Sequence, residues 1–78
     1  MKFLVYDNTV VNVDMIKRID LVDNSIVLVT FSDYSSWCIT RFSVDLFGLL
    51  TDFLHEDSKK TMFYLQHFLN EMEHEKKE

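Results

Sequence analysis

The fold of this chain is decided by residues 37–54, WCITRFSVDLFGLLTDFL, where the spacing of the hydrophobic residues changes at Ser43. Before Ser43 the hydrophobic runs are short and rich in β-branched and aromatic residues, which is typical of strands. After Ser43 the hydrophobic residues stand three and four positions apart, which is typical of a helix with one buried face. Strands that precede helices, rather than alternating with them, predict an α+β fold with an antiparallel sheet.

Residues 2–42 predict an antiparallel meander of four or five strands. Asp and Asn residues separate the hydrophobic runs at 7–9 and 23–24, and both residue types favour tight turns. The run at 26–31 is hydrophobic at nearly every position. We therefore expect it to be a central strand with both faces covered.

Two helices are predicted after the meander, at 43–54 and 58–75. Ser43 is expected to cap the first helix, because its hydroxyl can accept an N–H group of the first turn. Gly48 lies inside this helix, where glycine is unfavourable, so we expect it to mark a close approach to the sheet. The charged tail, residues 73–78, is expected to fray.

The composition predicts a single folded domain over residues 1–78. Hydrophobic residues make up 47% of the chain and aromatic residues 14%, which argues against disorder. The net charge is −5 and the basic residues are scattered, which argues against binding to nucleic acid. The apolar stretch near the N-terminus is too short for a signal peptide or a membrane span. We expect a cytoplasmic protein without a nucleic-acid or membrane partner.

Few side chains have a spacing that would support catalysis or metal binding. His67, Glu71 and His74 share one helical face at i, i+4 and i+7, but a fourth zinc ligand is missing. We interpret them as a solvated face. Cys38 lies in a predicted strand and is interpreted as a small buried hydrophobic residue. The sequence therefore predicts no enzyme activity, no cofactor and no metal.

The second helix carries a hydrophobic stripe larger than a chain of this size easily buries. Burial of such a surplus against a second copy is common, so the sequence predicts a homodimer. Aromatic residues at the junction of a loop and a strand could add a second contact, since Tyr and Trp dominate binding hot spots. The residues predicted to contact a partner are Tyr34, Trp37, Met62, Leu65, Phe68, Leu69 and Met72.

One stretch of the sequence has a family resemblance. The spacing Asn12-Val13-Asp14-x-Ile16-x-x-Ile19, followed by a hairpin, a strand and a helix, resembles small bacterial flagellar regulatory proteins of the FlbD type. It equally resembles many short proteins of phages and Gram-positive bacteria. The resemblance covers about residues 3–47 and implies a regulatory protein, without assigning functional residues. This chain has Asp33-Tyr34-Ser35-Ser36 where the flagellar proteins tend to carry an Asn-Gly turn, and it adds a long second helix.

The function that the sequence favours is a small non-catalytic module for protein interaction or regulation. A flagellar-type regulatory protein is one alternative. Another is an inhibitor from a mobile element that mimics nucleic acid, which would need the thirteen Asp and Glu residues to cluster on one face. An enzyme or metal protein would need a pocket around Cys38 or a metal at His67, Glu71 and His74.

Overall fold

The computed structural model describes residues 1–55 and 59–76, and within that part the strands form two three-stranded sheets. Sheet A has the strand order β2-β1-β6 and sheet B has the order β3-β4-β5. Two helices follow the strands of sheet B, so the α+β class is confirmed. The elements are β1 (Phe3–Tyr6), β2 (Thr9–Asn12), the 3₁₀ turn η1 (Val13–Met15), β3 (Ile16–Val22), β4 (Ile26–Phe31), β5 (Ser36–Ile39), α1 (Ser43–Leu54), β6 (Met62–Tyr64) and α2 (Leu65–Lys76).

The predicted meander is divided between the two sheets. β3, β4 and β5 form an antiparallel meander with β4 at its centre, as the hydrophobic run at 26–31 predicted. The expectation that both faces of this strand are covered is wrong, because burial alternates along it and only Val27, Val29 and Phe31 are buried. β1 and β2 pair only with each other and with β6 among the described strands. The chain passes from one sheet to the other through η1, where the side chain of Asn12 accepts the N–H of Asp14 at 2.9 Å.

The second helix begins later than the sequence predicts. Residues 62–64 form β6, which runs parallel to β1, and α2 begins at Leu65. The N–H of Phe3 donates to the carbonyl of Thr61 at 2.8 Å, so this segment completes the pairing of β1. Two lysines at 59–60 also disfavour a helix start there, because positive charge opposes the helix dipole. Residues 56–58, which include the predicted start, lie outside the described residues.

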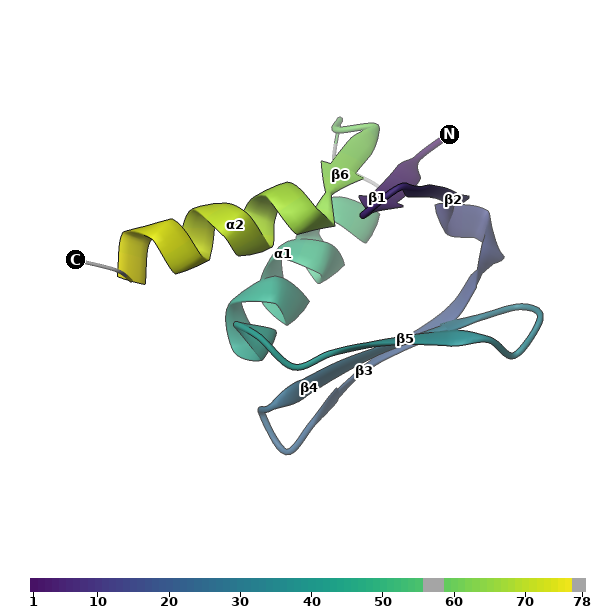
Figure 1. Cartoon of the computed structure of the whole chain (residues 1–78). Helices are drawn as coiled ribbons and strands as arrows, with labels where there is room; N and C mark the ends of the chain where they lie inside the picture. Colours follow the sequence, from purple (N-terminus) through teal and green to yellow (C-terminus); the bar gives the residue numbers. More distant parts are fainter. Residues whose placement is uncertain (56–58, 77–78) are drawn as a thin grey trace.

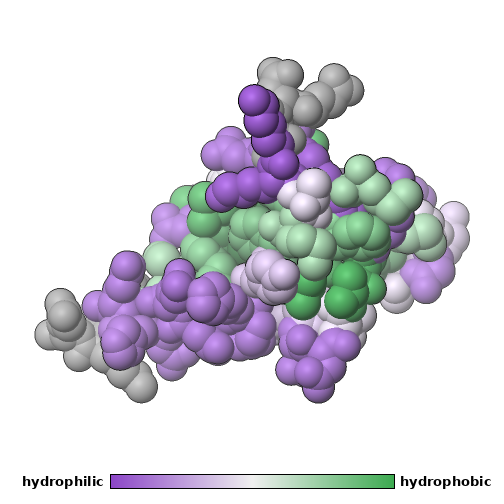
Figure 2. All heavy atoms as spheres, turned by 90° about the horizontal axis from the view of Figure 1, so that it is seen from above, coloured by the Kyte–Doolittle hydropathy of each residue, from purple (hydrophilic) through white to green (hydrophobic). Residues whose placement is uncertain are grey.

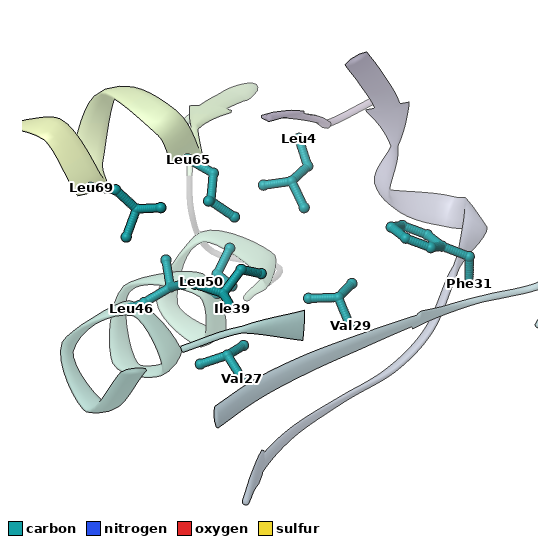
Figure 3. Close-up of a cluster of buried hydrophobic side chains, with 9 residues drawn as sticks. All are labelled: Leu4, Val27, Val29, Phe31, Ile39, Leu46, Leu50, Leu65 and Leu69. Atoms are coloured by element: carbon teal, nitrogen blue, oxygen red, sulfur yellow. The ribbon is translucent and has the colours of Figure 1, made fainter. Parts of the chain in front are cut away.

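The elements are stacked in layers, as Figure 1 shows. Sheet B lies at the bottom, α1 lies above it, and sheet A and α2 lie at the top. Figure 3 shows Leu4 of β1 and Leu65 and Leu69 of α2 pointing toward α1 and sheet B. One buried cluster therefore joins all the layers, and it consists of Leu4, Val27, Val29, Phe31, Ile39, Leu46, Leu50, Leu65 and Leu69.

The hairpin between β3 and β4 has the turn that its sequence predicts. Asp23 and Asn24 both have positive φ, at 52° and 58°, and the N–H of Ser25 donates to the carbonyl of Val22 at 3.0 Å. Two successive left-handed residues are the signature of a type I′ turn, whose twist matches that of the paired strands. Asp and Asn tolerate this conformation better than other non-glycine residues.

The start of α1 differs from the sequence prediction at two residues. Phe42 is the N-cap in a left-handed conformation (φ 52°), without a capping side-chain hydrogen bond. Ser43 is inside the helix and buried, and its hydroxyl donates to the carbonyl of Ser25 at 2.7 Å, which ties α1 to the β3–β4 turn. The expected close approach at Gly48 is also wrong, because nothing lies within 4 Å of the position that a Cβ would occupy.

The other end of α1 is held by a lysine from the start of sheet A. The ammonium of Lys2 donates to the carbonyls of Phe53 and His55 at 2.6 and 2.7 Å. It also lies 5.4 Å from the centroid of the Phe53 ring. A positive charge at a helix C-terminus compensates the partial negative charge of its last carbonyls. This contact fixes α1 beneath sheet A.

Candidate interaction surfaces

Sheet A is apolar on both of its faces. The inner face presents Leu4, which is fully buried. Cross-strand pairs on the outer face join Phe3 with Met62, Val5 with Tyr64 and Val5 with Val10. Val10 and Tyr64 are 60% and 54% exposed. Seen from above in Figure 2, hydrophobic side chains gather over the region of sheet A, beside the hydrophilic outer surface of α2.

We name this surface the sheet A face and define it as Phe3, Val5, Val10, Met62 and Tyr64. An antiparallel or mixed sheet with one face in water normally carries polar residues on that face. At the paired positions that the structure describes, the one amide side chain beside this face belongs to Asn12, which pairs with Phe3, and none of the paired side chains is charged. The sheet A face is therefore less polar than the outer face of a sheet in contact with water usually is.

Sheet B has an outer face of the ordinary kind. On this face Leu28 of β4 pairs with Asp20 of β3 on one side and with Cys38 of β5 on the other. Two residues further along β4, Thr30 pairs with Arg18 of β3. Arg18 and Asp20 form an ion pair of 2.9 Å, which raises the pKa of the Arg18 guanidinium. Cys38 is exposed on this face, so its interpretation as a buried hydrophobic residue is wrong. The alternation within residues 36–39 places Trp37 and Ile39 inward and Cys38 outward.

The predicted stripe of the second helix is divided among three environments. Leu65 and Leu69 are 0% and 2% exposed and belong to the core of this chain, so their side chains are not at the surface. Met62 lies on the sheet A face. Phe68 and Met72 are half-buried and line a groove between α1 and α2. The helix thus packs within its own chain in this structure.

The two predicted aromatic contacts, Tyr34 and Trp37, have different surroundings. Trp37 is half-buried, and its ring meets those of Tyr6 and Phe31 edge-on, with centroids 5.2 and 4.9 Å away. Tyr34 is 78% exposed at the β4–β5 loop, with the ammonium of Lys17 4.6 Å from its ring centroid. In Figure 1 this loop lies at the opposite end of the molecule from the C-terminal end of α2. Tyr34 and the hydrophobic stripe of the second helix therefore do not form one surface.

The backbone of the β4–β5 loop is strained at Tyr34 and fixed by its neighbours. Tyr34 has a φ of 70°, which is unusual for a bulky residue. The carboxylate of Asp33 accepts the hydroxyl and the N–H of Ser35 at 2.6 and 3.0 Å. These hydrogen bonds favour the ionised form and lower the pKa of Asp33. The loop thus presents an exposed aromatic ring on an ordered turn.

The groove between the helices forms a second apolar surface, which we name the helix groove. It is lined by Val44, Asp45, Gly48, Leu49, Phe68 and Met72, and its volume is about 460 Å³. Val44 and Leu49 are 55% and 44% exposed. Of the residues that line this groove, the sequence predicts only Phe68 and Met72 of α2 to contact a partner.

The polar face of α2 forms an ion pair. Nε2 of His67 lies 2.9 Å from Oε1 of Glu71, with both side chains largely exposed. His74 does not share this contact. Among the described residues, no group of three or more His, Cys, Asp or Glu side chains is arranged to hold a metal ion. Also within those residues, none of the helices has the length and apolar content to cross a membrane.

Acidic and basic side chains alternate over parts of the surface. Arg18 pairs with Asp20 on sheet B, and Arg41 pairs with Glu73 at 2.7 Å between the start of α1 and α2. An acidic mimic of nucleic acid needs an uninterrupted face of carboxylates. The two ion pairs place a basic side chain beside a carboxylate on sheet B and beside α1, which disfavours that alternative.

Four of the five residues of the sheet A face, Phe3, Val5, Val10 and Tyr64, are not among the residues that the sequence predicts to contact a partner. The signal for the first strand was present: residues 3–6 are hydrophobic at each position, which indicates a strand covered on both sides. The sequence does not predict that Val44 and Leu49 are exposed, because each occupies a helical position that could have faced the core.

No protein family matches the sequence, and neither the characterised proteins nor the solved structures include a significant match.

Proposed function

We propose that this chain is a non-catalytic protein-interaction module, and that it forms a homodimer through the sheet A face. The observation that supports the proposal is the apolar outer face of a sheet whose inner face already packs on the core. Sheet B, in the same chain, has a mixed outer face, on which Val22 and Leu28 lie beside the Arg18–Asp20 ion pair. The exposed thiol of Cys38 is compatible with a reducing compartment, so we place this activity in the cytoplasm.

A second copy suits this surface for an electrostatic reason. The chain carries a net charge of −5, so two copies repel one another over most of their surfaces. The cross-strand pairs of the sheet A face consist of uncharged side chains. Two such faces can approach without bringing carboxylates together, and sheets commonly pack face to face in this way.

The size of the face sets the expected affinity. Three strands about 4.8 Å apart and about four residues long give a footprint of roughly 200 Å². A standard interface buries about 800 Å² per partner. We therefore expect a weak dimer with a dissociation constant of roughly 10–100 µM.

A pair of matched valine variants tests the proposal. Val10 and Val22 are both exposed (60% and 40%), but Val10 lies on the sheet A face and Val22 on the outer face of sheet B. In sedimentation equilibrium, Val10→Lys should weaken the dimer at least about tenfold, because it buries a charge. Val22→Lys should leave the dimer unchanged. A wild-type chain that stays monomeric at 500 µM, a concentration about five times the upper estimate, would refute the homodimer.

A further inference from the structure

The helix groove is open to solvent along the side of α1. Gly48 lies in the middle of it, and the space where its Cβ would be has no neighbour within 4 Å. Val44 and Leu49 project on either side of this gap with half of their surface exposed. Phe68 and Met72 of α2 form the other wall. The groove therefore has apolar walls and, at Gly48, room for a side chain that this chain does not supply.

The groove continues at both ends. Val44 and Asp45 also line a hollow with Arg41 and Glu73 at the start of α1. Leu49 also lines a hollow with Phe53, Phe63 and Lys60 toward the end of α1. The twelve residues of α1 span about 18 Å, which is the length of roughly three turns of a second helix.

Carboxylates line the α1 side of this channel and lie near its α2 side. Asp45 lines the groove itself, and Asp52 lines the adjoining hollow with Leu49. On α2, residues 71 and 75 are both glutamates, three positions after Phe68 and Met72, so they lie along the same side of the helix. All four carboxylates are exposed. Positive charge is present at the ends, where Arg41 pairs with Glu73 and Lys60 lines the hollow with Asp52, and Glu71 lies 2.9 Å from Nε2 of His67.

We propose that the helix groove binds an amphipathic helix of another protein, with hydrophobic residues on one side and lysine or arginine on its flanks. Helix-in-groove recognition places hydrophobic side chains at i, i+3 or i+4 and i+7 into such a channel. The acidic sides favour a basic partner over a second copy of this acidic chain. The inference goes beyond the homodimer proposed above, because it uses a different surface and a different partner.

A synthetic probe can test the groove directly. The probe is a 15-residue peptide of leucine and lysine with helical spacing, labelled for fluorescence anisotropy, and the control is the same peptide with glutamate in place of lysine. We expect the lysine peptide to bind with a dissociation constant in the micromolar range and the glutamate peptide not to bind. Absence of binding by the lysine peptide at 1 mM protein would overturn the proposal.

Two pairs of protein variants separate groove binding from general attraction. Gly48→Leu fills the gap and favours the helix, so it should keep the fold and weaken binding at least about tenfold, whereas Gly48→Ala should weaken it less than about threefold. Asp45→Asn with Asp52→Asn should weaken binding about fivefold. Asp14→Asn with Asp23→Asn removes the same charge elsewhere and should have little effect. Equal loss in the two charge variants would overturn the proposal.

The sheet A variant distinguishes this inference from the proposed homodimer. Val10→Lys should bind the lysine peptide as well as the wild type does, because residue 10 lies outside the groove. If Gly48→Leu dissociates a homodimer and leaves peptide binding unchanged, then the occupant of the groove is a second copy and the present inference is wrong.

Discussion

The two sheets of this protein have similar inner faces and different outer faces. Leu4 of sheet A and Val29 of sheet B are both fully buried in one core. On the outside, sheet B carries the Arg18–Asp20 ion pair, while sheet A carries the apolar pairs of Val5 with Val10 and with Tyr64. Burial in the core explains why the inner faces are hydrophobic, but it does not explain the hydrophobic residues on the outer face of sheet A. The proposed interaction rests on the outer face of sheet A, because the hydrophobic residues placed there do not belong to the buried core.

The largest expected effect concerns the inner faces. Leu4→Ala and Val29→Ala should each destabilise the chain, by about 2–5 kcal/mol for the leucine and somewhat less for the valine, because each leaves a cavity in a shared core. Urea unfolding followed by tryptophan fluorescence and by circular dichroism should give one coincident transition for both variants. Two separate transitions would show that sheet A folds independently, and the comparison would then be between two domains.

The next effect concerns the attachment of sheet A to α1. Lys2→Met removes the two hydrogen bonds from the ammonium to the last carbonyls of α1 and should cost about 1–2 kcal/mol. Lys17→Met on sheet B is the matched control. It loses only an exposed contact with the Tyr34 ring and should change the free energy of unfolding by less than about 0.5 kcal/mol. Equal effects of the two variants on thermal unfolding would contradict this account.

Thiol labelling compares the two outer faces directly. Cys38 on sheet B should react with a thiol reagent at a rate that is independent of protein concentration. A thiol introduced by Val10→Cys in a Cys38→Ser background should react about fivefold more slowly at a concentration ten times the dimer dissociation constant, because only the monomer exposes it. A concentration-independent rate at position 10 would argue against burial of the sheet A face.

The smallest effect concerns the loop of sheet B. The Ser35 hydrogen bonds lower the pKa of Asp33, so their contribution is present above the ordinary pKa of aspartate and is lost as the pH falls through the lowered value. In an NMR titration, Ser35→Ala should raise the pKa of Asp33 toward its ordinary value. Ser36→Ala, which lies one residue further along, should leave it unchanged.

The helix groove could not have been identified from the sequence, although part of its wall could. The 3-4 spacing predicted a buried stripe on the second helix, and Leu65 and Leu69 are buried as that spacing requires. Which remaining residues stay exposed depends on the angle at which α2 passes α1. That angle depends on the connection through β6, and the helical spacing of residues 58–75 did not predict a strand there.

The sequence by itself determined the α+β class, the β3–β4 turn at Asp23-Asn24 and the position of β4, because each depends on local spacing and turn chemistry. The tertiary structure decided the division into two sheets. A three-residue segment at 62–64 has too short a pattern to distinguish a strand from a helix, and it becomes a strand because β1 offers unpaired backbone groups. This long-range pairing adds Met62 and Tyr64 to the sheet A face, and so creates the surface on which the proposed function rests.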